Sequence, residues 1–136
     1  MLNKYALFKN YILHFSKLIM ERDSYSDEQI LDILSLKKIA VIGMSKHSSK
    51  AAHYVPKYLI DNGYDVTPVN PTAEKILDVT CYDSISEIYG DVDVIDVFRP
   101  SEQISSIIRD CIEKKPKVIW LQEGIHDFES EELARK

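Results

Sequence analysis

The chain is poor in cysteine and has no long apolar run, and each shortage excludes a class of protein. Its two cysteines, Cys81 and Cys111, lie far apart and form no CxxC or metal-ligand spacing. This excludes a disulfide scaffold and suits a reducing, cytoplasmic compartment, so we interpret both as small buried side chains. No apolar run approaches the ~20 residues of a membrane span, which predicts a soluble chain.

Positive charge is also in short supply. The 136 residues carry a formal net charge of −5, which disfavours nucleic acid and anionic membranes as general partners. An anionic ligand would therefore need a local cluster of cations. At this length we expect one domain with a self-sufficient core and a short appended segment.

The central feature of the sequence is a βαβ unit. The apolar run 39–42 has no polar alternation, as is typical of a parallel strand covered on both faces, and it stops at Gly43. The polar, cationic turn 45–50 leads into a helix that ends at Asn62-Gly63, and 66–71 forms the second strand. A right-handed crossover makes the strands parallel, so their carboxyl ends open on one edge, where ligands bind.

Further strands and helices follow this unit. Residues 72–84 are expected to be irregular, with a short helical turn over 85–89. Third and fourth strands are predicted at 92–98 and 118–121, separated by a helix from Ser101, and a polar helical tail closes the chain. This alternation predicts an α/β protein with an open, mostly parallel sheet and helices on both faces.

Residues 1–25 are interpreted as an N-terminal helical extension and 26–136 as the α/β domain. In 1–22 apolar residues recur at helical spacing and form a wide face that must be covered. Two partners stay open for this face: the chain's own domain, or a second subunit in a homo-oligomer. Ser26 and Gln29 form a capping-box pattern that begins a short helix.

The turn after the first strand has features of an anion site but lacks those of a dinucleotide site. Gly43 is its one glycine, so the GxGxxG fingerprint is absent. The second strand ends in Asn70, where a ribose-binding Asp or Glu would stand. A helix begins after the turn and favours an anion, and Lys46 and Lys50 supply charge. The alternative, a solvated polar loop that only caps the helix, stays open.

Five motifs, spread in order over most of the chain, carry a family resemblance. They are IAVIGMS (39–45), VPKYLIDNGYDVTPVNP (55–71), CYDSISEI (81–88), VDVIDVFRPSE (92–102) and VIWLQEGI (118–125). In these motifs the chain resembles the small stand-alone CoA-binding proteins. Those are similar to the CoA-binding domain of succinyl-CoA synthetase α subunits and ADP-forming acyl-CoA synthetases. The resemblance implies a Rossmann-like fold. It also implies a final strand beyond Lys136, so two alternatives stay open: the protein is truncated here, or another element fills that edge of the sheet.

The resemblance further implies that coenzyme A or an acyl-CoA lies across the strand ends. In this arrangement the first turn and a basic residue would face the phosphates. The end of the second strand would face the adenosine, and the end of the third strand would face the pantetheine or a phosphate. With Lys46 added for its charge, the candidate residues are Gly43, Met44, Ser45, Lys46, Lys50, Val69, Asn70, Pro71, Phe98, Arg99, Pro100, Gln122 and Gly124. For Arg99, pairing with Asp96 or Glu102 is the alternative.

No catalytic centre is expected. His47, His53 and His126 stand in no motif that arranges a nucleophile, a base and an orienting group. We interpret His47 and His126 as exposed loop residues and His53 as a helix residue. Asp93 and Asp96 are interpreted as structural residues at the rim of a strand. We therefore predict a CoA-binding protein without chemistry of its own. The alternatives are an NAD(P)-dependent reductase with an atypical nucleotide-binding loop and an interaction module that works through its N-terminal helix.

Overall fold

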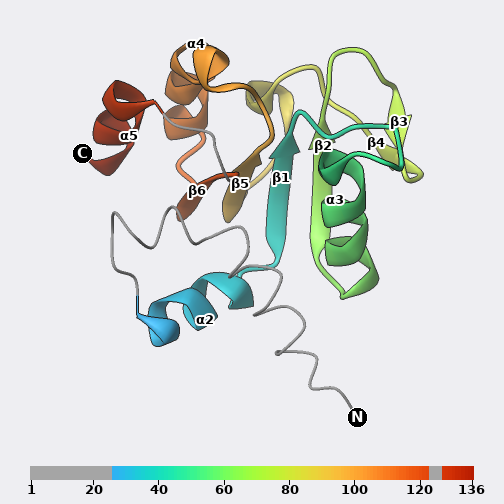
Figure 1. The fold of residues 1–136 in the computed structure, drawn as a ribbon, viewed down its shortest axis with the longest axis horizontal. Coiled ribbons are helices and arrows are strands. Elements are labelled where there is room, and N and C mark those ends of the chain that lie inside the picture. The colour runs from blue at the N-terminus through green and yellow to red at the C-terminus, as the bar shows by residue number, and fades with distance from the viewer. Residues whose placement is uncertain (1–25, 123–126) are drawn as a thin grey trace.

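The computed structural model of the chain describes residues 26–122 and 127–136. It confirms the α/β class, because four parallel strands form one sheet in the order β2-β1-β5-β6 (Figure 1). The strands are β1 (Lys38–Ile42), β2 (Asp65–Val69), β5 (Val94–Val97) and β6 (Val118–Leu121). The predicted N-terminal helix, Gly124 and His126 lie outside the described residues, so the predictions made for them stay predictions.

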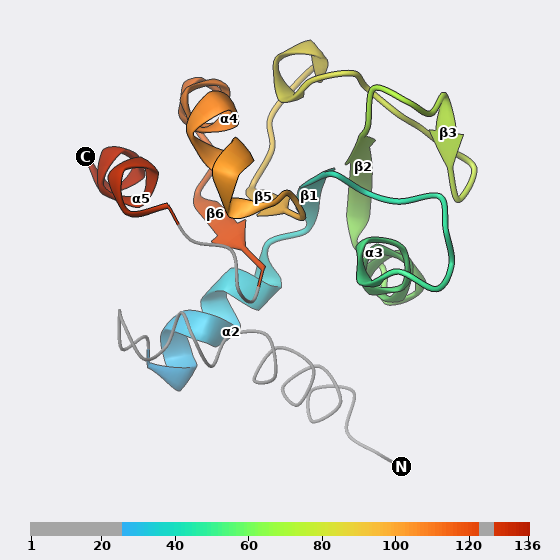
Figure 2. The ribbon, with the colours of Figure 1, turned by 45° about the horizontal axis from the view of Figure 1, so that its top comes forward.

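Helices cover both faces of the sheet, as the strand–helix alternation predicts. Helix α3 (Ala51–Asp61) lies on one face, and helix α4 (Ser101–Glu113) and the 3-10 helix η1 (Ile85–Glu87) lie on the other (Figure 2). Helix α2 (Asp27–Ser35) precedes β1, and helix α5 (Phe128–Arg135) packs against α4. The connections of β1 and β5 therefore run over opposite faces.

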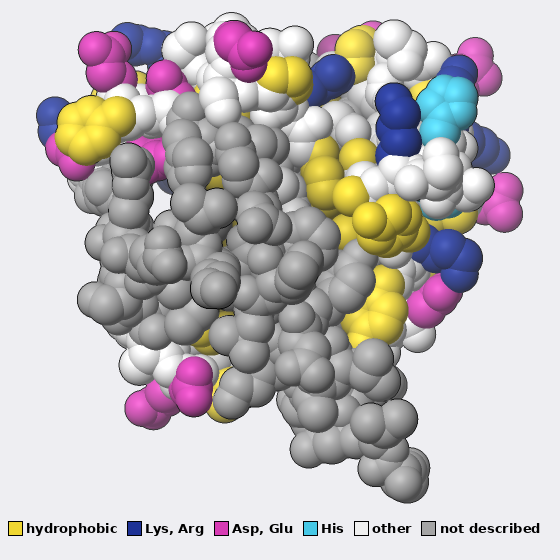
Figure 3. Space-filling view, viewed as in Figure 1, with side chains coloured by type: hydrophobic (Ala, Val, Ile, Leu, Met, Phe, Trp, Pro, Cys, Tyr) yellow, Lys and Arg dark blue, Asp and Glu magenta, His cyan; other side chains and the backbone are white. Residues whose placement is uncertain are grey.

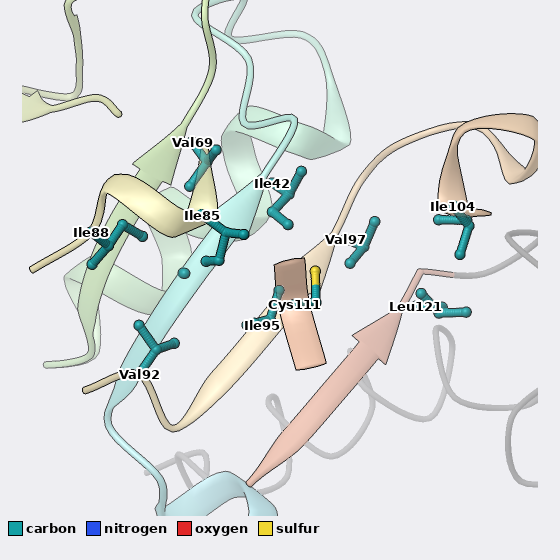
Figure 4. Close-up of a cluster of buried hydrophobic side chains, with 11 residues drawn as sticks. Ile42, Val69, Ile85, Ile88, Val92, Ile95, Val97, Ile104, Cys111 and Leu121 are labelled. Atoms are coloured by element: carbon teal, nitrogen blue, oxygen red, sulfur yellow. The ribbon is translucent and has the colours of Figure 1, made fainter. Parts of the chain in front are cut away.

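Each face of the sheet has its own apolar core. Ala40 and Ile42 of β1 face the α4 side, whereas Ile39 and Val41 face the α3 side. Because both faces of β1 are buried, its sequence shows the uninterrupted apolar run. The α4-side core is drawn in Figure 4, and its labelled members are Ile42, Val69, Ile85, Ile88, Val92, Ile95, Val97, Ile104, Cys111 and Leu121.

The predicted ends of two helices are confirmed. The Ser26 side chain accepts a hydrogen bond from the Gln29 N–H at 3.2 Å, and the Gln29 side chain accepts one from the Ser26 N–H at 2.8 Å. This is the complete capping box that begins α2. At the end of α3, Asn62 is the C-cap and Gly63 has a φ of +86°.

The prediction of irregular structure over 72–84 is wrong in part. Strands β3 (Lys75–Ile76) and β4 (Val79–Thr80) form a short antiparallel hairpin. Its two turn residues, Leu77 and Asp78, have positive φ values of 53° and 61°, a conformation that hairpin turns usually give to Asn-Gly or Asp-Gly. The Leu-Asp pair gives no such signal, so the hairpin was not visible in the sequence.

The prediction that both cysteines are buried is confirmed for Cys111 and wrong in part for Cys81. Both are free; Cys111 is buried in the α4-side core, whereas Cys81 is half-buried. Burial, with a smaller effect of the neighbouring Asp110 charge, raises the pKa of the Cys111 thiol to about 12, which leaves it without a reactive thiolate. Over 26–122 and 127–136, no helix has both the length and the apolarity to cross a membrane.

Candidate functional site

The sheet has a switch point between β1 and β5. These strands are neighbours, yet β1 continues to α3 on one face and β5 to α4 on the other. A switch of this kind opens a crevice beyond the carboxyl ends of the strands, the usual ligand site of open α/β sheets. We call the chain segments at this edge, 43–50, 70–72 and 98–100, the rim. They lie beyond the tip of the β1 arrow in Figure 1.

Gly43 is where the loops after β1 and β5 meet. A Cβ atom placed on Gly43 would lie 2.5 Å from the Phe98 carbonyl oxygen and 3.2 Å from Arg99 Cδ, and the residue has a φ of +83°. Only glycine fits this conformation and this close approach. The Gly43 N–H also donates to the Val69 carbonyl at 2.9 Å. Three of the predicted site segments are thereby brought together.

Asn70 joins the end of β2 to the same loop. Its Nδ2 donates to the Met44 carbonyl at 2.8 Å. Its Oδ1 accepts from the Thr72 N–H at 2.8 Å and from the Thr72 hydroxyl at 2.7 Å. The side chain therefore braces two rim segments at the position where a dinucleotide-binding protein carries a ribose-binding carboxylate.

The predicted site residues differ in how they are exposed. Met44 and Val69 are 0% and 3% exposed and belong to the two cores, so neither residue presents its side chain to a ligand at the rim. Lys46, Lys50, Pro71 and Pro100 are exposed, and Ser45, Asn70, Phe98 and Arg99 are half-buried. Cationic side chains and a histidine gather over the β1–α3 connection (Figure 3).

Arg99 follows β5 at the rim and is half-buried. In the described part of the chain it forms no ion pair with Asp96 or Glu102, so the alternative prediction for this residue is wrong. Asp96 is buried and is bonded to Gln122 instead. Among the described residues, no ion pair therefore occupies the N–H donors of the Arg99 guanidinium, a group that suits the binding of an anion.

Two helices begin at the rim without side-chain caps. The N-caps of α3 and α4, Lys50 and Pro100, make no capping hydrogen bond through a side chain. The N-caps of α2 and α5, Ser26 and Asp127, both do. The N-terminal N–H groups and the dipole of a helix attract anions, so the rim carries two such attractive ends.

Gln122 lies at the end of β6 with its side chain turned inward. It is 7% exposed, and its Nε2 donates to Asp96 Oδ1 at 2.5 Å. Its Oε1 is buried and has no hydrogen-bond partner among the described residues. Burial raises the pKa of the Asp96 carboxyl to about 7, and the hydrogen bond from Gln122 opposes that rise. The sequence predicts Asp96 at the end of a strand, whereas the structure buries the residue inside β5.

Sequence reasoning missed His53 as part of the site. It was assigned to the helix only, whereas its Nδ1 is 2.7 Å from the Ser45 carbonyl oxygen. Its position early in the helix, directly after the polar turn, was the available signal. His47 is exposed, as expected. No group of three His, Cys, Asp or Glu side chains in the described segments is arranged to hold a metal ion.

Comparison with known families decides the relationship. The family described as CoA binding domain matches residues 37–136. The chain belongs to this family. Among curated members, it is 36% identical over 112 residues to the uncharacterized protein YneT of Bacillus subtilis (strain 168), and the match covers 82% of this chain and 83% of YneT.

The chain is also similar to part of a much longer relative. The chain is 32% identical over 96 residues, 69% of its length, to an ADP-forming acetate–CoA ligase II of Archaeoglobus fulgidus, of which it spans only 14%. A solved structure of a hypothetical protein from Pyrococcus horikoshii OT3 is 35% identical, with a TM-score of 0.80, and the match covers 83% of this chain and 80% of that one. The family resemblance and the Rossmann-like fold are therefore confirmed.

Proposed function

We propose that the protein binds coenzyme A or an acyl-CoA at the rim and has no chemistry of its own. The observation that carries this proposal is the convergence of Gly43, Asn70 and Arg99 at the switch point of a chain in the CoA-binding domain family. Rims of this kind are the ligand sites of open α/β sheets. The name of the Archaeoglobus relative identifies that enzyme as a CoA ligase, which supports the same ligand here.

The charge distribution supports a polyanionic ligand. The chain carries a net charge of −5, yet Lys46, Lys50 and Arg99 all lie on the rim segments. Two uncapped helix N-termini begin there as well. In our proposal the phosphates lie against these cations and against the two helix N-termini, which both attract negative charge.

Calorimetric titration tests this proposal against its alternative. The protein is titrated with CoA, acetyl-CoA, NAD and NADP in the same low-salt buffer. We expect CoA to bind and NAD not to bind, because β2 is followed by Asn70 in place of a carboxylate, and the Asn70 side chain already bonds to Met44 and Thr72. Preference for NAD or NADP would instead support the reductase, and the absence of binding by CoA and acetyl-CoA would end the proposal.

Removing the rim cations should weaken CoA binding. We expect Lys50→Ala and Arg99→Ala each to raise the Kd about tenfold, the effect of losing one charge-assisted hydrogen bond. Each should also flatten the dependence of Kd on salt, since one fewer charge pair is screened. Lys57→Ala is the matched control for Lys50→Ala. Lys50 is the N-cap of α3, and Lys57 lies further along the same helix, where its Nζ pairs with Asp61 Oδ2 at 2.6 Å. Unchanged affinity in a rim variant would remove that residue from the site.

A further inference from the structure

Pro56 leaves one carbonyl of α3 without its helical partner. The residue lies inside the helix and its side chain is fully buried. Because proline has no N–H, the carbonyl of Ala52, four residues earlier, cannot form the usual hydrogen bond within the helix. An interior proline is the least favourable residue for a helix, so its presence in α3 calls for a compensating role.

The loop after β1 supplies the missing donor. The Ser45 N–H donates to the Ala52 carbonyl at 2.9 Å. The Ser45 carbonyl oxygen lies 2.7 Å from His53 Nδ1. Since a carbonyl can only accept, the proton of this bond is on Nδ1. Both main-chain polar groups of Ser45 are thus held by the first turns of α3, an arrangement we call the Ser45 clamp.

The Ser45 clamp belongs to a wider set of bonds that fixes the loop. The preceding carbonyl, that of Met44, accepts from Asn70 Nδ2 at 2.8 Å. The Ser45 hydroxyl oxygen accepts from the His47 N–H at 3.1 Å. A loop that is already ordered loses less conformational freedom when a ligand binds, and so binds it more tightly.

We propose that His53 and Pro56 are positioning residues, which hold Ser45 on α3 and so keep the β1–α3 loop in the shape that receives the anionic ligand. The inference rests on the proposed function. His53 is 9% exposed and Pro56 is fully buried, so both act through Ser45 and not by touching the ligand. Pro56 has no N–H, which leaves the Ala52 carbonyl free to accept from the Ser45 N–H. His53 donates from Nδ1 to the Ser45 carbonyl.

Three variants test the clamp. Pro56→Ala introduces an N–H that competes with Ser45 for the Ala52 carbonyl, and His53→Leu removes the donor to the Ser45 carbonyl. We expect each to raise the Kd for CoA about fivefold, the equivalent of one neutral hydrogen bond. His53→Asn, whose amide can donate from the position of Nδ1, should restore most of the affinity. In all variants, hydrogen exchange of the Ser45 amide should accelerate wherever affinity falls.

A stability control separates positioning from folding. Val55→Ala truncates another buried residue of α3 and should lower the melting temperature while leaving the Kd within about twofold of wild type. Wild-type affinity and unchanged Ser45 exchange in both Pro56→Ala and His53→Leu would overturn the inference. So would an equal loss of affinity in Val55→Ala. If the wild type binds neither CoA nor acetyl-CoA, the proposed function fails, and the exchange rate of the Ser45 amide still decides the clamp.

Discussion

Gly43→Ala should lower the free energy of unfolding by about 3 kcal/mol or more and abolish CoA binding. The new methyl group would lie 2.5 Å from the Phe98 carbonyl oxygen, and the backbone has a φ of +83°. Both the strained backbone and the forced separation of the β1 and β5 loops contribute to the cost. Urea unfolding measures the first effect and calorimetric titration the second.

Gly90→Ala is the matched control for this substitution. Gly90 has a φ of +88°, close to that of Gly43, but a Cβ there would meet nothing within 4 Å. It should therefore show only the backbone cost, about 1 kcal/mol, and bind CoA normally. Equal destabilisation by the two substitutions would mean that the contact between Gly43 and Phe98 is not what holds the loops together.

Asp96→Asn should make the protein more stable than wild type at pH 8. The unfolded carboxyl loses its proton near its ordinary pKa of 3.8, whereas the buried native carboxyl keeps it up to about pH 7. Between these values the native state binds more protons, so wild-type stability falls as the pH rises, by up to about 4 kcal/mol in total. Asparagine does not titrate, so the variant should lack this fall.

The neighbouring amide adds to the effect of this substitution. The side-chain oxygen of the introduced asparagine can accept from Gln122 Nε2, as Asp96 does, while its amide nitrogen can donate to the unpartnered Gln122 Oε1. Asp93→Asn is the control. Asp93 is half-buried, and a hydrogen bond from the Lys38 N–H lowers its pKa, so its stabilisation is lost only as the pH falls through the acid range. Urea unfolding from about pH 5 to pH 8 measures both variants, and a wild-type slope in Asp96→Asn would contradict the account.

Local sequence signals predicted the βαβ unit and the helix ends well. The run 39–42 reads as a doubly covered strand because each successive side chain enters one of two cores. Ser26 and Gln29 indicate a cap because both partners lie within one turn. In such cases the interaction that fixes the structure joins residues close together in the chain.

Non-local contacts could not be predicted in the same way. Asp96 and Gln122 are 26 residues apart, and their bond depends on the pairing of β5 with β6. The glycine at 43 was visible in the sequence, but the Phe98 carbonyl against which it lies was not. The Ser45 clamp likewise needs the loop to turn back onto α3. The family resemblance indicated which segments form the site, whereas the structure supplies the contacts that join them.

Mapping the amide signals of the protein during a CoA titration tests the central claim most directly. In ¹⁵N-resolved NMR spectra we expect CoA to shift the amides of Gly43, Lys50 and Arg99 at the rim. The amides of Gly63 and Lys117, which precede β2 and β6 at the opposite edge of the sheet, should stay in place. Shifts at Gly63 and Lys117 with none at the rim would contradict the account.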